Sequence, residues 1–312
     1  MPFPGSARKE HGALDIIRFS AVFAVERNLL ICSDKNMSNN PEIGKSIIVN
    51  GIQTNYQDHG EGPPVLLIHG SGPGTSASTS WRQTIPALSP RFRLIAPDML
   101  GFGFTERPSN VQYKLDTWVD HTLGLLSALD IPKAHVVGTS YGGAVALALA
   151  ARAPQRVDRL VLISAVGISF PITETLDSIW GYTPSVASMR AMLDLLVYDR
   201  SLLTDEMARL RYEASIRPGF QEAFSSMFTA PRQKALDGLA TPEHLIKALP
   251  HKALLIHGRE DQINPLSTSQ RLFNLIDDAQ LHVFGRCCHM PQAEHAARFN
   301  RLVGDFLAEG TP

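Results

Sequence analysis

The feature that most constrains this chain is a glycine-flanked serine, Gly138-Thr139-Ser140-Tyr141-Gly142. Residues 135–138 before it are typical of the end of a buried strand, and the small apolar residues 144–151 after it favour a helix. A strand and a helix can approach closely at such a turn only where no Cβ intervenes, as at glycine. We therefore predict Ser140 at the tip of a sharp turn, above a helix N-terminus that favours developing negative charge.

Strand and helix patterns alternate around this turn. The expected strands are residues 46–50, 53–59, 65–69, 93–96, 135–138, 157–164, 252–257 and 280–284. The expected helices outside the middle of the chain are residues 81–88, 115–129, 144–151 and 293–307. The first two strands flank Asn50-Gly51, a strong hairpin signal. The later alternation predicts an α/β fold with a mostly parallel eight-stranded sheet and helices on both faces.

The alternation stops between residues 165 and 233, where the sequence is helical and amphipathic. We predict an inserted helical cap at 165–233, which divides the core domain into residues 37–164 and 234–312. Residues 1–36 are predicted to be a poorly ordered, dispensable leader, because Met37 begins a stretch that looks like a natural protein start.

The composition limits which binding partners and which cellular location are plausible. The formal net charge is −1, so nucleic acid and anionic membranes are poor candidates as partners, and a small molecule is expected. No apolar run is long enough to span a membrane. Three cysteines, Cys32, Cys287 and Cys288, cannot form a disulfide framework, and no zinc-ligand spacing is present. A reducing, cytoplasmic location without a bound metal is predicted.

Two later strand exits supply the partners that a nucleophilic serine needs. A serine hydroxyl requires a base within hydrogen-bond reach, and the base requires an orienting carboxylate. Asp261 follows the strand expected at 252–257, and His289 follows the strand expected at 280–284. Carboxyl ends of parallel strands meet at one edge of a sheet. Ser140, Asp261 and His289 are therefore predicted to form a catalytic triad, in the chain order nucleophile, acid, base.

Other polar residues at strand exits are alternatives to this set. Glu260 is a rival to Asp261 as the acid. Asp98 lies in a Pro-Asp-x-x-Gly-x-Gly stretch, which is typical of turn capping. His69 borders the predicted site, where bracing the neighbouring loop is its simplest role. His257 is interpreted as a hydrogen-bonded structural histidine.

An oxyanion formed by attack on a carbonyl needs hydrogen-bond donors. The backbone N–H of Tyr141, the residue after the nucleophile, is one candidate. The other comes from the glycine-rich loop after the strand at 65–69, near Ser71 or Gly72. These N–H groups can act whatever the side chains are.

From about Glu42 to Leu307 the chain resembles the meta-cleavage product hydrolases, carbon–carbon bond hydrolases of the α/β-hydrolase fold that act in aromatic degradation. It is most similar to the 2-hydroxymuconic semialdehyde hydrolase branch. The matching segments are His69–Gly74 (HGSGPG), Ala96–Phe104 (APDMLGFGF), Ala208–Ser215 (ARLRYEAS), Gly258–Gln262 (GREDQ) and Leu281–Cys287 (LHVFGRC). The cap segment is the most discriminating, because caps vary between hydrolase families while triads do not.

The resemblance implies a cofactor-free reaction on 2-hydroxy-6-oxo-hexa-2,4-dienoates. The dienol is ketonised, and water then cleaves the C5–C6 bond. A cap arginine of the family holds the substrate carboxylate, and the matching residue is Arg211, whose planar guanidinium suits carboxylate. Arg209 and Arg217 are its neighbours, and Arg211 as one of several solvated cap cations is the alternative. Relatives of this kind commonly associate, so a homo-oligomer is an option.

The chain departs from the family pattern at five positions. Thr139 and Ser80 stand where the family usually has Asn, Ser78 where it has an aromatic residue, and Met290 where it has Trp. The first four are expected in or near the substrate-binding region, and Ser80, Thr139 and Met290 are predicted to bind substrate. Cys288 replaces a Gly, which would bring strain if the position required a positive φ. We expect a working serine hydrolase with altered selectivity.

Other activities use similar residues. A carboxylesterase with the same triad is the main alternative. A non-catalytic binding protein would not need nucleophile, acid and base together, and a dehalogenase would carry a carboxylate in place of Ser140. A hydroxynitrile lyase or a cofactor-free peroxidase would keep the triad, although nothing in the sequence favours either.

Overall fold

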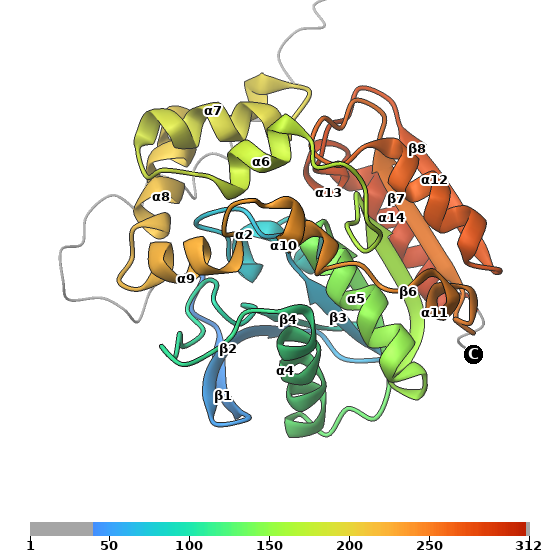
Figure 1. Cartoon of the computed structure of the whole chain (residues 1–312). Coiled ribbons are helices and arrows are strands. Elements are labelled where there is room, and N and C mark those ends of the chain that lie inside the picture. The colour runs from blue at the N-terminus through green and yellow to red at the C-terminus, as the bar shows by residue number, and fades with distance from the viewer. Residues whose placement is uncertain (1–39, 310–312) are drawn as a thin grey trace, which may run out of the picture. The chain divides into compact units, whose positions relative to one another are not determined.

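The computed structural model describes residues 40–309, and the leader expected at residues 1–36 lies outside this range. Eight strands form one sheet in the order β1-β2-β4-β3-β5-β6-β7-β8 (Figure 1). The strands are β1 Lys45–Val49, β2 Ile52–His59, β3 Pro64–Ile68, β4 Arg93–Pro97, β5 Ala134–Thr139, β6 Val157–Ile163, β7 Ala253–Gly258 and β8 Ala279–Phe284. Strand β2 pairs antiparallel with β1 and β4, and all other pairs are parallel. The prediction of a mostly parallel eight-stranded sheet is confirmed.

The first two strands form the hairpin that Asn50-Gly51 predicts. Val49 pairs with Ile52, which leaves Asn50 and Gly51 as the two turn residues. Their φ values are 51° and 82°. Positive φ at both central positions matches the right-handed twist of the flanking strands, and Asn-Gly tolerates it best.

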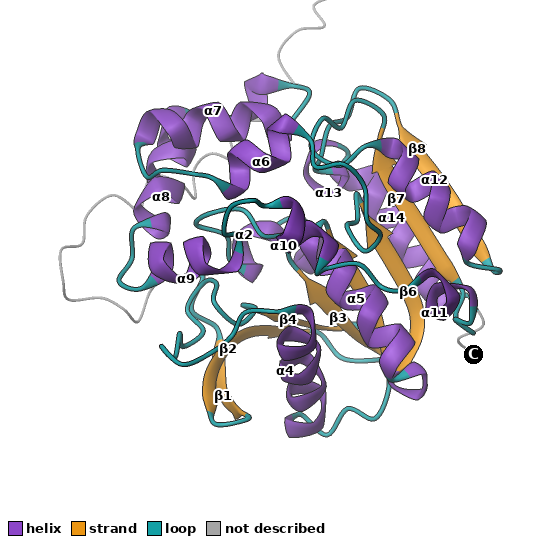
Figure 2. Cartoon of the chain, in the orientation of Figure 1, coloured by secondary structure: helices purple, strands orange, loops and turns teal. Residues whose placement is uncertain are grey.

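Helices cover both faces of the sheet (Figure 2). The helices are α2 Ala77–Ser80, α3 Thr84–Leu88, α4 Leu115–Ala128, α5 Tyr141–Arg152, α6 Glu174–Trp180, α7 Val186–Leu196, α8 Asp205–Ser215, α9 Phe220–Met227, α10 Gln233–Asp237, α11 Glu243–Lys247, α12 Leu266–Leu275, α13 Pro291–Glu294 and α14 Ala296–Ala308. Short 3₁₀ turns lie at Pro154–Arg156 and Arg200–Leu202. No helix within residues 40–309 is both long and apolar enough to cross a membrane.

Alternating side chains of the central strands enter two hydrophobic clusters. Leu66, Ile68 and Val136 belong to the cluster that includes residues of α4 and α5. Leu67 and Val137 belong to the cluster that includes residues of α3 and α14. A strand sends successive side chains to opposite faces, so strands that are covered on both faces are apolar throughout.

The helix predicted at residues 81–88 is wrong as a single element. The structure has α2 and α3, which are separated by a turn at residues 81–83. Pro86 lacks the N–H that would continue the ladder to Arg82. It is accommodated in the first turn of α3, where N–H groups have no helical partner. Helix α2 has its own capping box, in which Ser76 and Thr79 satisfy each other's backbone N–H groups.

Four longer helices, α6 to α9, occupy the segment between β6 and β7 where strand patterns are absent. Figure 1 shows them grouped apart from the strands. Serine and threonine begin three of them, since Thr173, Ser185 and Thr204 each accept a backbone N–H at the helix N-terminus. Three of these four helices therefore have a side-chain cap at the N-terminus, and α9 begins after Gly219 without one.

Candidate active site

Ser140 lies at the tip of the turn between β5 and α5. Its φ is 54° and its ψ is −120°, a conformation that L-residues rarely adopt. Its backbone N–H donates to Ile163 O at 2.8 Å, and its carbonyl accepts from Val166 N at 3.1 Å. Buried main-chain contacts with β6 and the residues after it therefore hold the serine in this conformation.

Glycines allow the close approach that this turn needs. A Cβ on Gly138 would lie 2.2 Å from Gly142 O, and a Cβ on Gly142 would lie 2.4 Å from Ile68 O. A Cβ on Gly143 would lie 2.4 Å from the Cβ of Ala165. Real Cβ atoms do not approach other atoms so closely, so the position of Ser140 depends on these three glycines.

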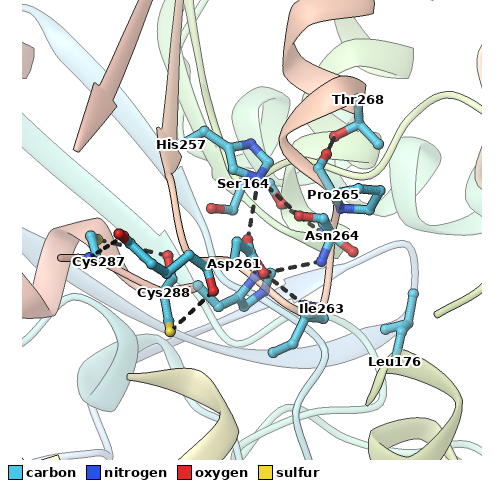
Figure 3. A network of polar contacts seen from close by, with 12 residues as sticks. Ser164, Leu176, His257, Asp261, Ile263, Asn264, Pro265, Thr268, Cys287 and Cys288 are labelled. Carbon is cyan, nitrogen blue, oxygen red and sulfur yellow. Dashed lines mark hydrogen bonds and ion pairs between the residues drawn. The ribbon is translucent and has the colours of Figure 1, made fainter. Parts of the chain in front are cut away.

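Asp261 and His289 meet at the ends of β7 and β8. His289 Nδ1 lies 2.8 Å from Asp261 Oδ2, which leaves Nε2 available for chemistry. The other carboxylate oxygen accepts the backbone N–H groups of Ile263 and Asn264 at 2.8 and 3.1 Å (Figure 3). Burial by itself would raise the pKa of Asp261, but the histidines beside it lower the pKa well below its usual range. The carboxylate is therefore ionised and fixed against the imidazole.

His257 is the second histidine against Asp261. Its Nε2 lies 3.4 Å from Asp261 Oδ2 and 2.9 Å from Asn264 O, and its Nδ1 lies 2.7 Å from Ser269 Oγ. Both ring nitrogens thus have protein partners, as expected for a structural histidine. Sequence reasoning missed its contact with the acid, although the spacing of four residues was visible.

Two glutamates hold the loop that carries His289. Glu260, the rival acid, accepts the backbone N–H of Cys287 at 3.0 Å and pairs with Arg259. Glu294 accepts the N–H of Cys288 at 2.7 Å with one oxygen and the N–H of Tyr198 at 2.6 Å with the other. These contacts give Glu260 a loop-holding role and leave the contact with His289 to Asp261.

The strain considered for Cys288 is absent. The positive φ in this loop falls on Arg286, at 55°, and not on Cys288. The residue that must be glycine is Gly258, where a Cβ would lie 1.8 Å from Cys288 O. Burial raises the pKa of the Cys288 thiol to about 11 and also raises that of Cys287. Both cysteines are free and both are inert thiols rather than nucleophiles.

His69 and Asp98 brace the opposite side of the site. His69 Nδ1 contacts Gly70 O at 2.7 Å, and its Nε2 accepts the N–H of Met99 at 2.9 Å. Burial lowers the pKa of His69 to about 4, so the ring is neutral at pH 7. Asp98 accepts N–H groups of Ala77 and Phe104 at 2.7 and 2.8 Å. Asp98 therefore caps turns, as the sequence indicates.

One pocket contains most of the predicted residues. Its lining residues are Gly70, Ser71, Gly72, Thr75, Thr79, Ser80, Thr139, Ser140, Leu176, Ile179, Trp180, Met192, Leu196, Arg211, Ile263, His289, Met290 and Gln292. Ser140 and His289 lie in it together with Arg211 from α8. Tyr141 is fully buried beneath, packed edge-on against Trp118. Ser78 is outside this lining, and its hydroxyl donates to Pro41 O at 3.3 Å.

Arg211 reaches the glycine-rich loop from the helical segment. Its Nε donates to Pro73 O at 3.0 Å, and its Nη2 donates to Thr75 Oγ1 at 2.6 Å. A Cβ on Gly74, whose φ is 69°, would lie 2.4 Å from the backbone oxygen of Arg211, so this loop needs a glycine there for the approach. Burial lowers the pKa of Arg211 to about 10, and both of its hydrogen-bond acceptors are neutral. The Glu42 carboxylate also acts on this charge and raises the pKa, and a part-buried guanidinium that lines a pocket can bind an anion.

Sequence reasoning missed four polar residues of the pocket, which are Thr75, Thr79, Trp180 and Gln292. Trp180 Nε1 donates to Ser71 Oγ at 3.1 Å and so links α6 to the glycine-rich loop. Gln292 is 4% exposed, lies two residues after Met290 and also lines the pocket. Its place close to His289 in the sequence was the one available signal. Within residues 40–309, no group of three or more His, Cys, Asp or Glu side chains could hold a metal ion.

The chain is similar to known hydrolases over most of its length. The alpha/beta hydrolase fold family matches residues 63–296. The chain is 60% identical over 271 residues to the 2-hydroxymuconate semialdehyde hydrolase of Pseudomonas sp. (strain CF600), covering 87% of this chain and 96% of that protein. It is 54% identical over 269 residues to a 2-hydroxy-6-oxo-2,4-heptadienoate hydrolase of Pseudomonas putida, covering 86% and 98%.

A solved structure with the same kind of activity in its name is also similar to this chain. The meta-cleavage product hydrolase CumD from Pseudomonas fluorescens IP01 superposes with a TM-score of 0.86 at 61% identity, covering 87% of this chain and 100% of that chain. That protein is a serine-to-alanine mutant complexed with acetates.

Proposed function

Since this chain belongs to the meta-cleavage product hydrolases of the α/β-hydrolase fold family, we propose that it hydrolyses the C5–C6 bond of 2-hydroxy-6-oxo-hexa-2,4-dienoates. The observation that carries the proposal is one pocket that contains Ser140, the Asp261-oriented His289 and the part-buried cation Arg211. The first two serve a serine hydrolase of any kind. The third selects substrates that carry a carboxylate.

Arg211 is proposed to bind the dienoate carboxylate. Its side chain is part-buried and lines the pocket, and a bound carboxylate would add charge-assisted hydrogen bonds to those that it makes with Pro73 and Thr75. The apolar part of the pocket, from α6 and α7, then faces the remainder of the substrate. The lining there includes Leu176, Ile179 and Met192.

The triad is proposed to act in both halves of the reaction. His289 Nε2 moves the proton from the 2-hydroxyl toward C5, which ketonises the dienol. Ser140 Oγ then attacks the C6 carbonyl while His289 takes its proton. Asp261 stabilises the imidazolium through Nδ1. The C5–C6 bond breaks, and its electron pair passes through the conjugated system to the oxygen at C2. That oxygen takes the proton from His289 to give a 2-hydroxypenta-2,4-dienoate, and water then releases the acyl group from Ser140.

The oxyanion at C6 is proposed to accept hydrogen bonds from the backbone N–H of Tyr141 and from the loop at Ser71 and Gly72. Tyr141 opens α5, where N–H groups lack helical partners. The side chain of Ser71 is engaged by Trp180, which fixes the loop for this purpose. The acetates of the solved relative are the acid that a methyl substituent at C6 would yield.

Single-turnover absorbance tests the proposal. The protein is mixed with the yellow 2-hydroxy-6-oxohepta-2,4-dienoate, next to a Ser140→Ala control. Loss of colour with the wild type and not with Ser140→Ala is the expected result. Persistent colour, with p-nitrophenyl acetate still cleaved in a Ser140-dependent way, would instead identify a carboxylesterase.

The organisation of the chain remains part of the proposal. We propose that residues 165–233 act as the cap over a core formed by 37–164 and 234–312, because helices α6 to α8 of that segment supply one wall of the pocket. We also propose a cytoplasmic location, supported by the free thiols of Cys287 and Cys288.

A further inference from the structure

The guanidinium of Arg211 is held at two of its three nitrogens. Nε donates to Pro73 O at 3.0 Å, and Nη2 donates to Thr75 Oγ1 at 2.6 Å. Within residues 40–309, the remaining nitrogen, Nη1, makes no hydrogen bond, and it is not among the unpartnered atoms that are closed off from solvent. Because a guanidinium is planar, two anchored nitrogens fix the direction of the third. The N–H groups of Nη1 are therefore available to a ligand in the pocket that Arg211 lines.

Thr75 is the side chain that provides one of the two anchors. Its backbone N–H donates to Gly72 O at 3.2 Å, and its carbonyl accepts the N–H of Gly103 at 3.2 Å. The residue is 3% exposed and lines the pocket. An arginine side chain only donates hydrogen bonds, so the Thr75 oxygen is the acceptor in this contact. A residue with a fixed backbone in the glycine-rich loop thus holds the end of a long side chain from α8.

The second anchor decides whether the cation is ordered before a ligand binds. With Pro73 O alone, the guanidinium could pivot about a single hydrogen bond, and ordering it would weaken ligand binding. We propose that Thr75 is a positioning residue, whose hydroxyl oxygen orients Arg211 so that Nη1 faces the carboxylate of the substrate. This inference rests on the carboxylate recognition proposed for Arg211 above. Thr75 then strengthens binding of the carboxylate through Arg211.

Sorbate, which is hexa-2,4-dienoate, is a suitable probe of this role. It has a carboxylate on a dienyl chain but no carbonyl at C6, so binding is measured without a reaction. Titration calorimetry gives the Kd of sorbate and of its uncharged amide, sorbamide. The wild type is expected to bind sorbate about tenfold more tightly than sorbamide, because Arg211 makes charge-assisted hydrogen bonds only with the carboxylate. Equal affinity for the two compounds would overturn the proposal.

Thr75→Val keeps the shape of the side chain and removes the acceptor. We expect it to weaken sorbate binding about fivefold, the effect of one lost hydrogen bond, and to leave the Kd of sorbamide within about twofold. A merely structural role would weaken both compounds alike. Thr75→Ser retains the hydroxyl and is expected to keep the wild-type ratio of the two Kd values. An unchanged ratio in Thr75→Val, or a fivefold change in Thr75→Ser, would contradict the proposal.

Arg211→Met tests whether Thr75 acts through the arginine. This variant has no guanidinium to orient, so adding Thr75→Val to it should leave the Kd of sorbate unchanged. A further fivefold loss in the double variant would mean that Thr75 affects the ligand by another route, and the proposal would be wrong.

Thr122→Val is the matched control. Thr122 is a buried threonine on α4 that lies outside the pocket lining, and its hydroxyl donates to Trp118 O at 2.8 Å. Its loss should lower the stability of the fold without changing the ratio of the two Kd values. An equal change of the ratio in Thr122→Val would overturn the proposal.

Two further measurements keep the test decisive. If Thr75→Val does not fold, Thr75→Ala removes the same acceptor and should give the same fivefold change, so an unchanged ratio there would overturn the proposal. The calorimetric assay does not depend on catalysis. A wild type that binds sorbate in a Thr75-dependent way but leaves the dienoate intact would contradict the proposed reaction and support the role of Thr75.

Discussion

The two walls of the pocket are held together in different ways. On the core wall, Ser140 and the His289–Asp261 pair sit at strand ends, where backbone hydrogen bonds and close glycine contacts fix their positions. On the helical wall, residues of α6 to α8 reach the pocket through long side chains such as Trp180 and Arg211. We expect the chemistry to use the first wall, because it needs fixed geometry. We expect selectivity to depend on side chains of the second wall.

Asp261→Asn should give the largest loss of activity, because it removes the carboxylate charge beside His289 on the core wall. The asparagine would keep the shape but not the charge that orients and stabilises the imidazole. We expect kcat for the dienoate and for p-nitrophenyl acetate to fall about 10⁴-fold each.

Glu260→Gln is the matched control for that variant. Gln keeps an oxygen to accept the N–H of Cys287, so kcat should stay within about threefold of the wild type. A larger loss with Glu260→Gln than with Asp261→Asn, measured with either substrate, would make Glu260 the acid.

Arg211→Met tests whether the helical wall recognises the carboxylate. The kcat/KM for the dienoate should fall about 100-fold, as for one partner of a buried charge pair, while cleavage of neutral p-nitrophenyl acetate should be little changed. Arg209→Met is the control, since Arg209 is exposed and pairs with Glu206 at 2.6 Å. Equal losses for both substrates would mean that Arg211 supports the fold and not recognition.

The pH dependence of binding gives an independent check on Arg211. Burial lowers the pKa of Arg211, but a guanidinium keeps its charge at every pH at which the protein is folded. The KM for the dienoate should therefore stay level between about pH 7 and pH 10, as should the KM for the neutral ester. A rise confined to the dienoate would mean that a titrating group other than Arg211 binds the carboxylate.

The smallest expected effect on activity comes from two residues of the core wall that we expect to influence selectivity. Thr139 and Met290 lie on the core wall beside the triad, yet they line the pocket where the family usually has Asn and Trp. Restoring both, with Thr139→Asn and Met290→Trp, should raise single-turnover dienoate hydrolysis about fivefold through one regained hydrogen bond and tighter packing. No increase in a folded variant would show that these departures do not tune selectivity.

The same contrast explains what could be predicted from the sequence. The glycines around Ser140 and the residues after β7 and β8 are local signals, because each depends on one turn at one strand end. Gln292 and Trp180 reach the pocket only through tertiary packing, which no short-range pattern encodes. Ser78 and Ser80 show the limit of sequence-based prediction. They lie on one turn of α2, but Ser80 lines the pocket and Ser78 does not. The break between α2 and α3 could have been predicted from Pro86.

Glu294 links the helical wall to the core wall by two hydrogen bonds. Its carboxylate receives Tyr198 N, just after α7, and Cys288 N, just before His289, while Leu196 O receives the N–H of His289 itself at 3.1 Å. A tilt of α7 away from the core would stretch these bonds and pull on the backbone of the base. Any helical segment exchanged into this place would therefore need an acceptor for the N–H of His289, as Leu196 O is, and a donor for Glu294, as Tyr198 N is, to keep the position of the imidazole.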